Sequence, residues 1–236
     1  MIHTVPATGS TNADLAARLA AGERLAEGDW LVADRQSAGR GRHSRTWFDG
    51  AGNFMGSTVV QVGSGDPPAA SLALAVGLAV ADAVSPFIPP PRRALLKWPN
   101  DVMIGTAKLS GVLLEACGAA VIVGVGVNLN AAPVLPDRET IALSAFGPAP
   151  DRDLFAASIA ACLKAELERW RGYGLAPLIA RWLAAAHPPG TPLRAGEPGE
   201  TPLEGTFAGL ANDGALQLRL PDGTTRTIHA GEVRLA

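Results

Sequence analysis

The segment His187-Pro188-Pro189-Gly190 is the feature that most limits how this chain can fold. Adjacent prolines cannot continue a helix and a following glycine favours a turn, so the segment marks a domain boundary. Before it, helical and strand patterns alternate; after it, only short strands remain, separated by the turn sequences Asn212-Asp213-Gly214 and Pro221-Asp222-Gly223. The sequence therefore predicts an α+β domain over residues 1–187 and a small all-β domain over residues 188–236.

Apolar spacing and turn residues predict the individual elements of both parts. Helices are expected over 10–21, 69–84, 151–171 and 176–186, and strands over 30–34, 53–61, 94–98, 109–116 and 120–127. Beyond the boundary, strands are expected over 192–194, 204–210, 215–220 and 224–230. The Ala-rich stretch 69–84 is too short for a comfortable membrane span, so we expect it to be a buried helix.

Composition excludes several classes of protein. With 20 Lys and Arg against 22 Asp and Glu, the chain has no basic excess to follow a nucleic-acid backbone. The two cysteines have no CxxC spacing and the four histidines are scattered, so we expect no metal site built by the protein. Residues 1–6 lack the pattern of a signal peptide, so we expect a cytoplasmic protein that does not bind membranes.

An Arg- and Gly-rich segment, Asp34 to Trp47, contains four arginines and two glycines. Arginine presents a planar fork of donors to phosphates and carboxylates, glycine lets the backbone approach a ligand, and tryptophan offers a ring for stacking. The segment is typical of a loop that holds an anionic small molecule such as a nucleotide. The alternative is a solvated loop with no ligand.

Lysine is rare in this chain, with 3 residues against 17 arginines. Two of the three lysines, Lys97 and Lys108, lie in one short segment that also contains Trp98, Pro99, Asn100 and Asp101. The segment is predicted to be a strand, a tight turn and a strand, with polar side chains projecting from the turn. Retained lysines favour sites that need a compact ammonium, although two of three can also lie close together by chance.

Five motifs in order resemble those of the biotin–protein ligases. They are Ser10-Thr11-Asn12, Gly39-Arg40-Gly41-Arg42 with Trp47, Lys97-Trp98-Pro99-Asn100-Asp101, Lys108-x-Ser110-Gly111-x-Leu113-x-Glu115, and Gly124-Val125-Gly126-Val127-Asn128. Each motif alone is weak, but the ordered set is specific. The resemblance implies a mixed sheet flanked by helices, as in class II synthetases, for the catalytic domain (1–187). It implies an SH3-like β-barrel for residues 188–236.

The resemblance also implies a two-step reaction. ATP and biotin would give biotinyl-5'-adenylate and pyrophosphate, with Mg²⁺ bound through the phosphates, and biotin would then pass to a lysine of a biotin carboxyl carrier protein domain. The biotin carboxylate is already ionised at neutral pH, so the first step needs positive charge rather than a general base. This explains a site with arginines and Lys108 and without a catalytic His or Cys.

Residue roles follow from the matched positions. Biotin would be bound by Ser10, Thr11, Asn12, Gln36, Gly39, Arg40, Gly41, Arg42, Lys108, Gly111 and Gly126. ATP would be bound by Arg42, Arg45, Trp47, Asn100, Lys108 and Asn128, and the catalytic residues would be Lys108, Arg40 and Arg42. Gly124, like Gly111 and Gly126, would leave room for the bicyclic ring, or each glycine could mark a strand bulge. Asp101 would help deprotonate the acceptor lysine, or would only hydrogen-bond the turn.

Two departures from the family pattern matter. Ser44 stands where a glycine is usual, and serine is less free than glycine to adopt a positive φ. Only nine residues precede Ser10, so we expect no DNA-binding winged helix and no specific DNA partner. We also expect a monomer or homodimer.

The rival interpretations are a lipoate–protein ligase, disfavoured because no Arg-Arg-x-x-Gly-Gly-Gly segment is present, and a catalytically silent ligand-binding protein. A dehydrogenase or P-loop enzyme is disfavoured because neither glycine-rich fingerprint is complete.

Overall fold

The computed structural model of the chain describes residues 1–196 and 201–236. Its larger part is a seven-stranded sheet with the order β1-β2-β3-β7-β6-β5-β4. Only β1 and β2 pair in parallel, so the sheet is mixed, as predicted. The strands are β1 (Ile2–Val5), β2 (Trp30–Ala33), β3 (Phe54–Gln61), β4 (Ala94–Lys97), β5 (Asp101–Ile104), β6 (Ala107–Cys117) and β7 (Ala120–Val127).

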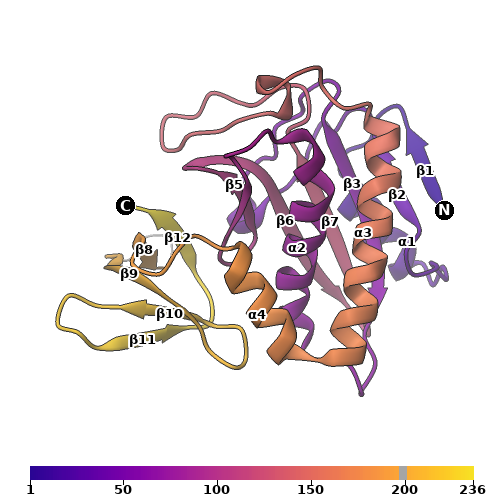
Figure 1. Cartoon of the computed structure of the whole chain (residues 1–236). Coiled ribbons are helices and arrows are strands. Elements are labelled where there is room, and N and C mark those ends of the chain that lie inside the picture. Colours follow the sequence, from indigo (N-terminus) through magenta and orange to yellow (C-terminus); the bar gives the residue numbers. More distant parts are fainter. Residues whose placement is uncertain (197–200) are drawn as a thin grey trace.

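Helices cover both faces of this sheet (Figure 1). Helix α1 (Thr11–Ala20) packs on one face against β3 and β7, whereas α2 (Leu72–Val84) and α3 (Arg152–Tyr173) pack together on the other. The side chains of β7 alternate between these two faces. On one face, Val121, Val123, Val125 and Val127 belong to the core beneath α2 and α3. Ile122 points to the α1 side, and the period of two places Gly124 and Gly126 on that side too.

The helical run that contains α2 extends beyond the predicted residues 69–84. With 3-10 turns at both ends (Ala69–Ser71 and Ser85–Phe87), the helical run Ala69–Phe87 has 19 residues and a mean hydropathy of 1.7. The expectation that this stretch is too short for a membrane is therefore corrected: length and composition alone would allow it to cross one. However, 67% of its most apolar window is buried inside the fold, as in a core helix.

The C-terminal part is a five-stranded antiparallel sheet with the order β11-β10-β9-β8-β12. Its strands are β8 (Pro192–Gly196), β9 (Leu203–Leu210), β10 (Leu216–Arg219), β11 (Thr225–Ile228) and β12 (Glu232–Leu235). The all-β character is confirmed, but within the described residues no pairing joins β11 to β12, so closure into a barrel is not seen. Helix α4 (Leu175–Ala185) precedes this sheet and contacts β9 (Figure 1).

The predicted elements are present, and three further strands appear. Strand β1 is an exposed edge strand with no apolar alternation, and β5 lies between the expected strands 94–98 and 109–116. The last strand, β12, is only four residues long. Short strands of this kind form because a neighbouring strand offers backbone partners, a signal that local sequence does not carry. Two further 3-10 turns cover Arg42–Ser44 and Leu143–Ala145.

Candidate functional site

A cavity of about 830 Å³ opens on the α1 side of the large sheet. It is lined by the start of α1, the loop from Gln36 to Phe48, strands β3 and β5–β7, the loop 133–140, and β12 of the C-terminal sheet. Every residue predicted to bind biotin or ATP lines it except Gly39, and so does Asp101. Gly39 instead lies against the loop backbone, where an added Cβ would come 3.2 Å from the Trp47 carbonyl oxygen.

Three glycines form the floor of this cavity. Gly111 and Gly126 face each other directly across β6 and β7. A Cβ added at Gly126 would lie 2.2 Å from the Trp47 indole, and one at Gly124 would lie 2.2 Å from Asn12 Oδ1. Real Cβ atoms do not approach so closely, so these positions need glycine to let polar and aromatic side chains lie flat on the sheet.

A hydrogen-bonded network fixes the polar end of the cavity. The Ser57 hydroxyl donates to Asn12 Oδ1 at 2.5 Å and lies 2.6 Å from the Thr11 hydroxyl, while Gln36 Oε1 accepts from the Thr11 amide at 2.8 Å. Ser10 caps α1 through a long 3.5 Å contact to the Ala13 amide. The network holds the amide groups of Asn12 and Gln36 in single orientations and leaves their remaining polar capacity for a ligand.

A β-bulge places Lys108 in the cavity. Along β6, Leu113 and Gly111 line the cavity while Val112 faces the helices. The pairing with β5 then skips Leu109, because Val102 pairs with Ser110 and Met103 with Lys108. This extra residue reverses the alternation and returns Lys108 to the cavity face.

Asp101 lies between two lysines. Its Oδ1 is 2.5 Å from Lys108 Nζ and its Oδ2 is 2.8 Å from Lys97 Nζ. Burial alone would raise the pKa of the Asp101 carboxyl, but the charges and hydrogen bonds of Lys108 and Lys97 hold it well below its usual range. A carboxylate with so low a pKa is a weak base, and both of its oxygens are occupied.

The Arg-rich loop is joined to the C-terminal sheet. Arg42 donates to the Gly231 carbonyl at 3.1 Å and to Asn100 Oδ1 at 3.4 Å, and Arg45 pairs with Glu232 at 2.6 Å. Burial would raise the pKa of Glu232, yet hydrogen bonds from Arg45 and Arg234 lower it from 4.5 to about 2. The cationic end of the cavity thus depends on both parts of the chain.

The unusual Ser44 adopts the left-handed conformation, with φ 57°, and follows His43 at φ 53°. A residue with a side chain pays about 1–2 kcal/mol for that conformation, which explains why glycine suits the position. Despite this, backbone hydrogen bonds join the two sides of the loop: Trp47 N donates to the Gly39 carbonyl, and Gly41 N donates to the Arg45 carbonyl.

Two buried polar atoms in the cavity have no hydrogen-bond partner among the described residues: Trp47 Nε1 and Asn128 Oδ1. The Lys108 ammonium lies 5.8 Å from the Trp47 ring centroid, within the range of a cation–π contact. Buried polar atoms without partners are costly, so each of these atoms is suited to receive a ligand group.

Sequence reasoning gave no role to three residues that support the site. Ser57 anchors Asn12, Glu232 holds Arg45, and Glu115 accepts from Asn12 Nδ2 at 2.6 Å while lying 3.5 Å from Arg40. Glu115 could have been found from the sequence, because it ends the motif that begins at Lys108, but Ser57 and Glu232 lie far from every motif.

The cavity combines a neutral, hydrogen-bonding end with a cationic end, as expected for an enzyme that joins a polar small acid to a nucleotide. Comparison with known proteins agrees. Residues 8–130 match the Biotin/lipoate A/B protein ligase family, and residues 194–235 match the biotin protein ligase C terminal domain. The chain therefore belongs to the biotin/lipoate A/B protein ligase family.

Individual relatives cover nearly the whole chain. A biotin–[acetyl-CoA-carboxylase] ligase of Mycobacterium tuberculosis is 38% identical over 98% of this chain and 88% of its own length. The enzyme of the same name from Paracoccus denitrificans is 39% identical over 96% and 97%. The structure of the Aquifex aeolicus biotin protein ligase in complex with biotin and ATP has a TM-score of 0.85 at 25% identity, covering 100% of this chain and 99% of that one.

Proposed function

We propose that this protein is a biotin–[acetyl-CoA-carboxylase] ligase, which activates biotin with ATP and transfers it to a lysine of a carboxyl carrier domain. One observation carries the proposal: a single cavity joins a neutral polar network around Asn12 to a cationic end around Lys108. The neutral end suits the ureido ring of biotin, whose donors and acceptors need buried partners. The cationic end suits its carboxylate and the phosphates of ATP.

In the first step a carboxylate oxygen of biotin attacks the α-phosphorus of ATP, and the bond to the bridging oxygen breaks to release pyrophosphate. An anion must approach a polyanion, so Lys108, Arg40 and Arg42 lower the barrier by neutralising charge. Mg²⁺ supplies further neutralisation when it is bound through the phosphates. No group of three or more His, Cys, Asp or Glu side chains that could hold a metal occurs in the described residues, so the nucleotide itself is the proposed metal ligand.

In the second step the amine of the acceptor lysine attacks the acyl carbon of the adenylate, and AMP leaves. That amine must first lose a proton, because its ordinary pKa is about 10.4. The two lysines that hold the Asp101 carboxylate make it a poor proton acceptor. We therefore assign Asp101 to holding Lys97 and Lys108 rather than to removing the proton.

The other roles are proposed on the same contacts. Ser10, Thr11, Asn12 and Gln36 bind the ureido ring over Gly111, Gly124 and Gly126, and Gly39, Arg40 and Gly41 follow the acid chain. Arg42, Arg45, Trp47, Asn100 and Asn128 bind the nucleotide. We place the boundary between a catalytic part and a C-terminal part at His187, and the reaction in the cytoplasm.

Release of pyrophosphate tests this function. Wild-type protein should release it only when ATP and biotin are both present, and lipoate in place of biotin separates the two kinds of ligase in the family. Lys108→Ala should lower the rate by about 10²–10³-fold, as for loss of a donor at a developing charge. The matched control is Lys164→Ala, whose side chain is 79% exposed on α3 and lies outside the cavity. Equal rates for the two variants would remove Lys108 from the mechanism.

A further inference from the structure

Lys97, the second lysine of the short segment, has no role in the chemistry described so far. It ends β4, and only 10% of its side chain is exposed. Its ammonium donates to the backbone carbonyl of Val233 in β12 at 2.7 Å and contacts Asp101 Oδ2 at 2.8 Å. Lys97 therefore touches the C-terminal sheet and the active site at the same time.

Asp101 continues these contacts to the reacting centre. Its other oxygen, Oδ1, lies 2.5 Å from Lys108 Nζ, and only 11% of its side chain is exposed. An unbroken row of three polar contacts thus runs from the Val233 backbone through Lys97 and Asp101 to Lys108. The three side chains are only 10%, 11% and 19% exposed, so each charge depends on its neighbour more than in an exposed pair.

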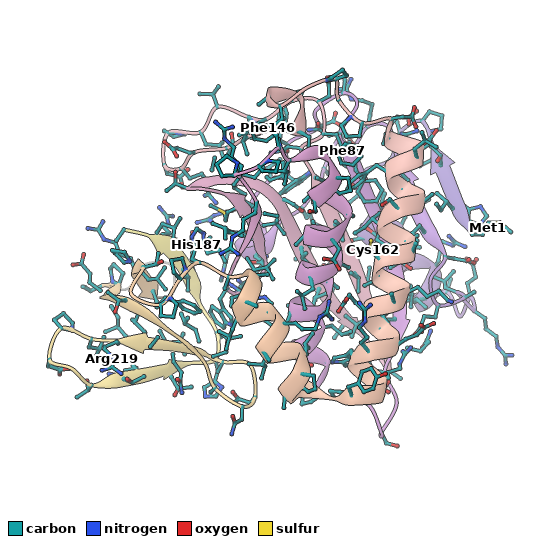
Figure 2. The ribbon with its side chains drawn as sticks, viewed as in Figure 1. Met1, Phe87, Phe146, Cys162, His187 and Arg219 are labelled. Atoms are coloured by element: carbon teal, nitrogen blue, oxygen red, sulfur yellow. The ribbon has the colours of Figure 1, made fainter. Side chains whose placement is uncertain are left out.

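Lys97 lies in a contact region, called the seam below, where β4 and the turn after it meet the chain from His187 onwards. His187 N donates to the Leu96 carbonyl at 3.3 Å, and the Trp98 indole donates to the Gly214 carbonyl at 3.1 Å. Figure 2 shows His187 where the chain leaves α4 for the C-terminal sheet. The side chains of Lys97 and Trp98 both donate hydrogen bonds across this seam. Of these two, only Lys97 also contacts an active-site carboxylate and lines the cavity.

We propose that Lys97 is a positioning residue that couples the seating of β12 to the placement of Lys108. Bound to the Val233 carbonyl, its ammonium holds the Asp101 carboxylate in place, and Asp101 in turn holds Lys108 at the biotin carboxylate and α-phosphate. A compact ammonium with three donors suits two acceptors in a closed space better than a planar guanidinium does. The proposal rests on the biotin ligase activity proposed above.

Lys97→Met and Lys97→Arg test the coupling through the kinetics of pyrophosphate release. Methionine keeps the length and apolar stem of lysine but removes the charge. Without Lys97, Asp101 and Lys108 lose their fixed geometry, and misplacement of a reacting group by about 1 Å can cost 10²-fold in rate. We expect Lys97→Met to lower kcat by about 10–100-fold and to raise the KM for biotin by a much smaller factor, because Lys108 also binds the biotin carboxylate whereas Asn12 and Gln36 are untouched. Lys97→Arg should recover part of kcat.

Trp98→Phe is the control, because it removes the hydrogen bond from Trp98 to the Gly214 carbonyl, and Trp98 does not contact Asp101. Its kcat should stay within about 3-fold of the wild type, with folding of each variant followed by thermal melting. An unchanged kcat in Lys97→Met, an equal loss in Trp98→Phe, or a rise in biotin KM that matches the fall in kcat would overturn the coupling. Absence of activity in the wild type would instead overturn the proposed function, so the two failures are distinguishable.

Discussion

Gly124→Ala should weaken biotin binding through Asn12. The added Cβ would lie 2.2 Å from Asn12 Oδ1, 2.9 Å from its Cγ and 3.1 Å from its Nδ2. Ordinary contacts are about 3.5–4.0 Å, so the Asn12 side chain must move by on the order of 1 Å. Asn12 is 4% exposed and is held by Ser57 on one side and Glu115 on the other, so it cannot move without breaking these hydrogen bonds.

The expected size of the effect follows from two hydrogen bonds of the Asn12 side chain. Moving Asn12 breaks its hydrogen bond from Ser57, worth about 1 kcal/mol, and its charge-assisted bond to Glu115, worth about 1.5–3 kcal/mol. A total of about 2.5–4 kcal/mol corresponds to a rise of roughly 70–1000-fold in the biotin Kd if the cost falls on binding. The nucleotide end of the cavity is untouched, so the Kd for ATP should change less than about 3-fold.

Isothermal titration calorimetry with biotin and, separately, ATP measures both constants. Gly172→Ala is the matched control, because a Cβ at that position in α3 would meet nothing within 4 Å and the change should be neutral or slightly stabilising. A folded Gly124→Ala protein that binds biotin as tightly as the wild type would refute the role of Asn12.

Two further predictions concern the Arg-rich loop. Hydrogen exchange across residues 35–47 should slow when biotinyl-adenylate binds, because the ligand brings negative charge to like-charged arginines, and equal exchange with and without it would show a preformed loop. The Glu232 pKa of about 2 in the folded chain lies below its usual 4.5, so the Arg45–Glu232 pair stabilises the fold above pH 4.5 and is lost as the pH falls towards 2. Melting of Glu232→Gln should therefore depend less on pH across that range than melting of the wild type, and parallel curves would contradict this.

Local apolar spacing and turn residues predicted the large elements. The cavity residues were named by the ordered motifs that resemble those of the biotin–protein ligases, and the structure adds that the valines of β7 face the helices. The bulge that turns Lys108 inwards depends on the register between β5 and β6, which no local pattern determines.

Contacts between segments far apart in the chain could also not be predicted from the sequence. Glu232 meets Arg45 across 187 residues, and Glu115 meets Asn12 across 103. Both pairs join segments that meet only after the chain has folded. Asp101 illustrates the same limit, because the turn before it was predictable but its place at the start of β5, between two lysines that suppress its basicity, was visible only in the fold.

The most direct test of the whole account is the mass of an acceptor. A biotin carboxyl carrier domain would be incubated with the protein, ATP and biotin, then weighed intact and mapped by peptide mass spectrometry. The account predicts a gain of one biotinyl group on a single lysine, dependent on ATP and strongly reduced in Lys108→Ala. An unmodified carrier, or labelling spread over many lysines without dependence on ATP, would contradict it.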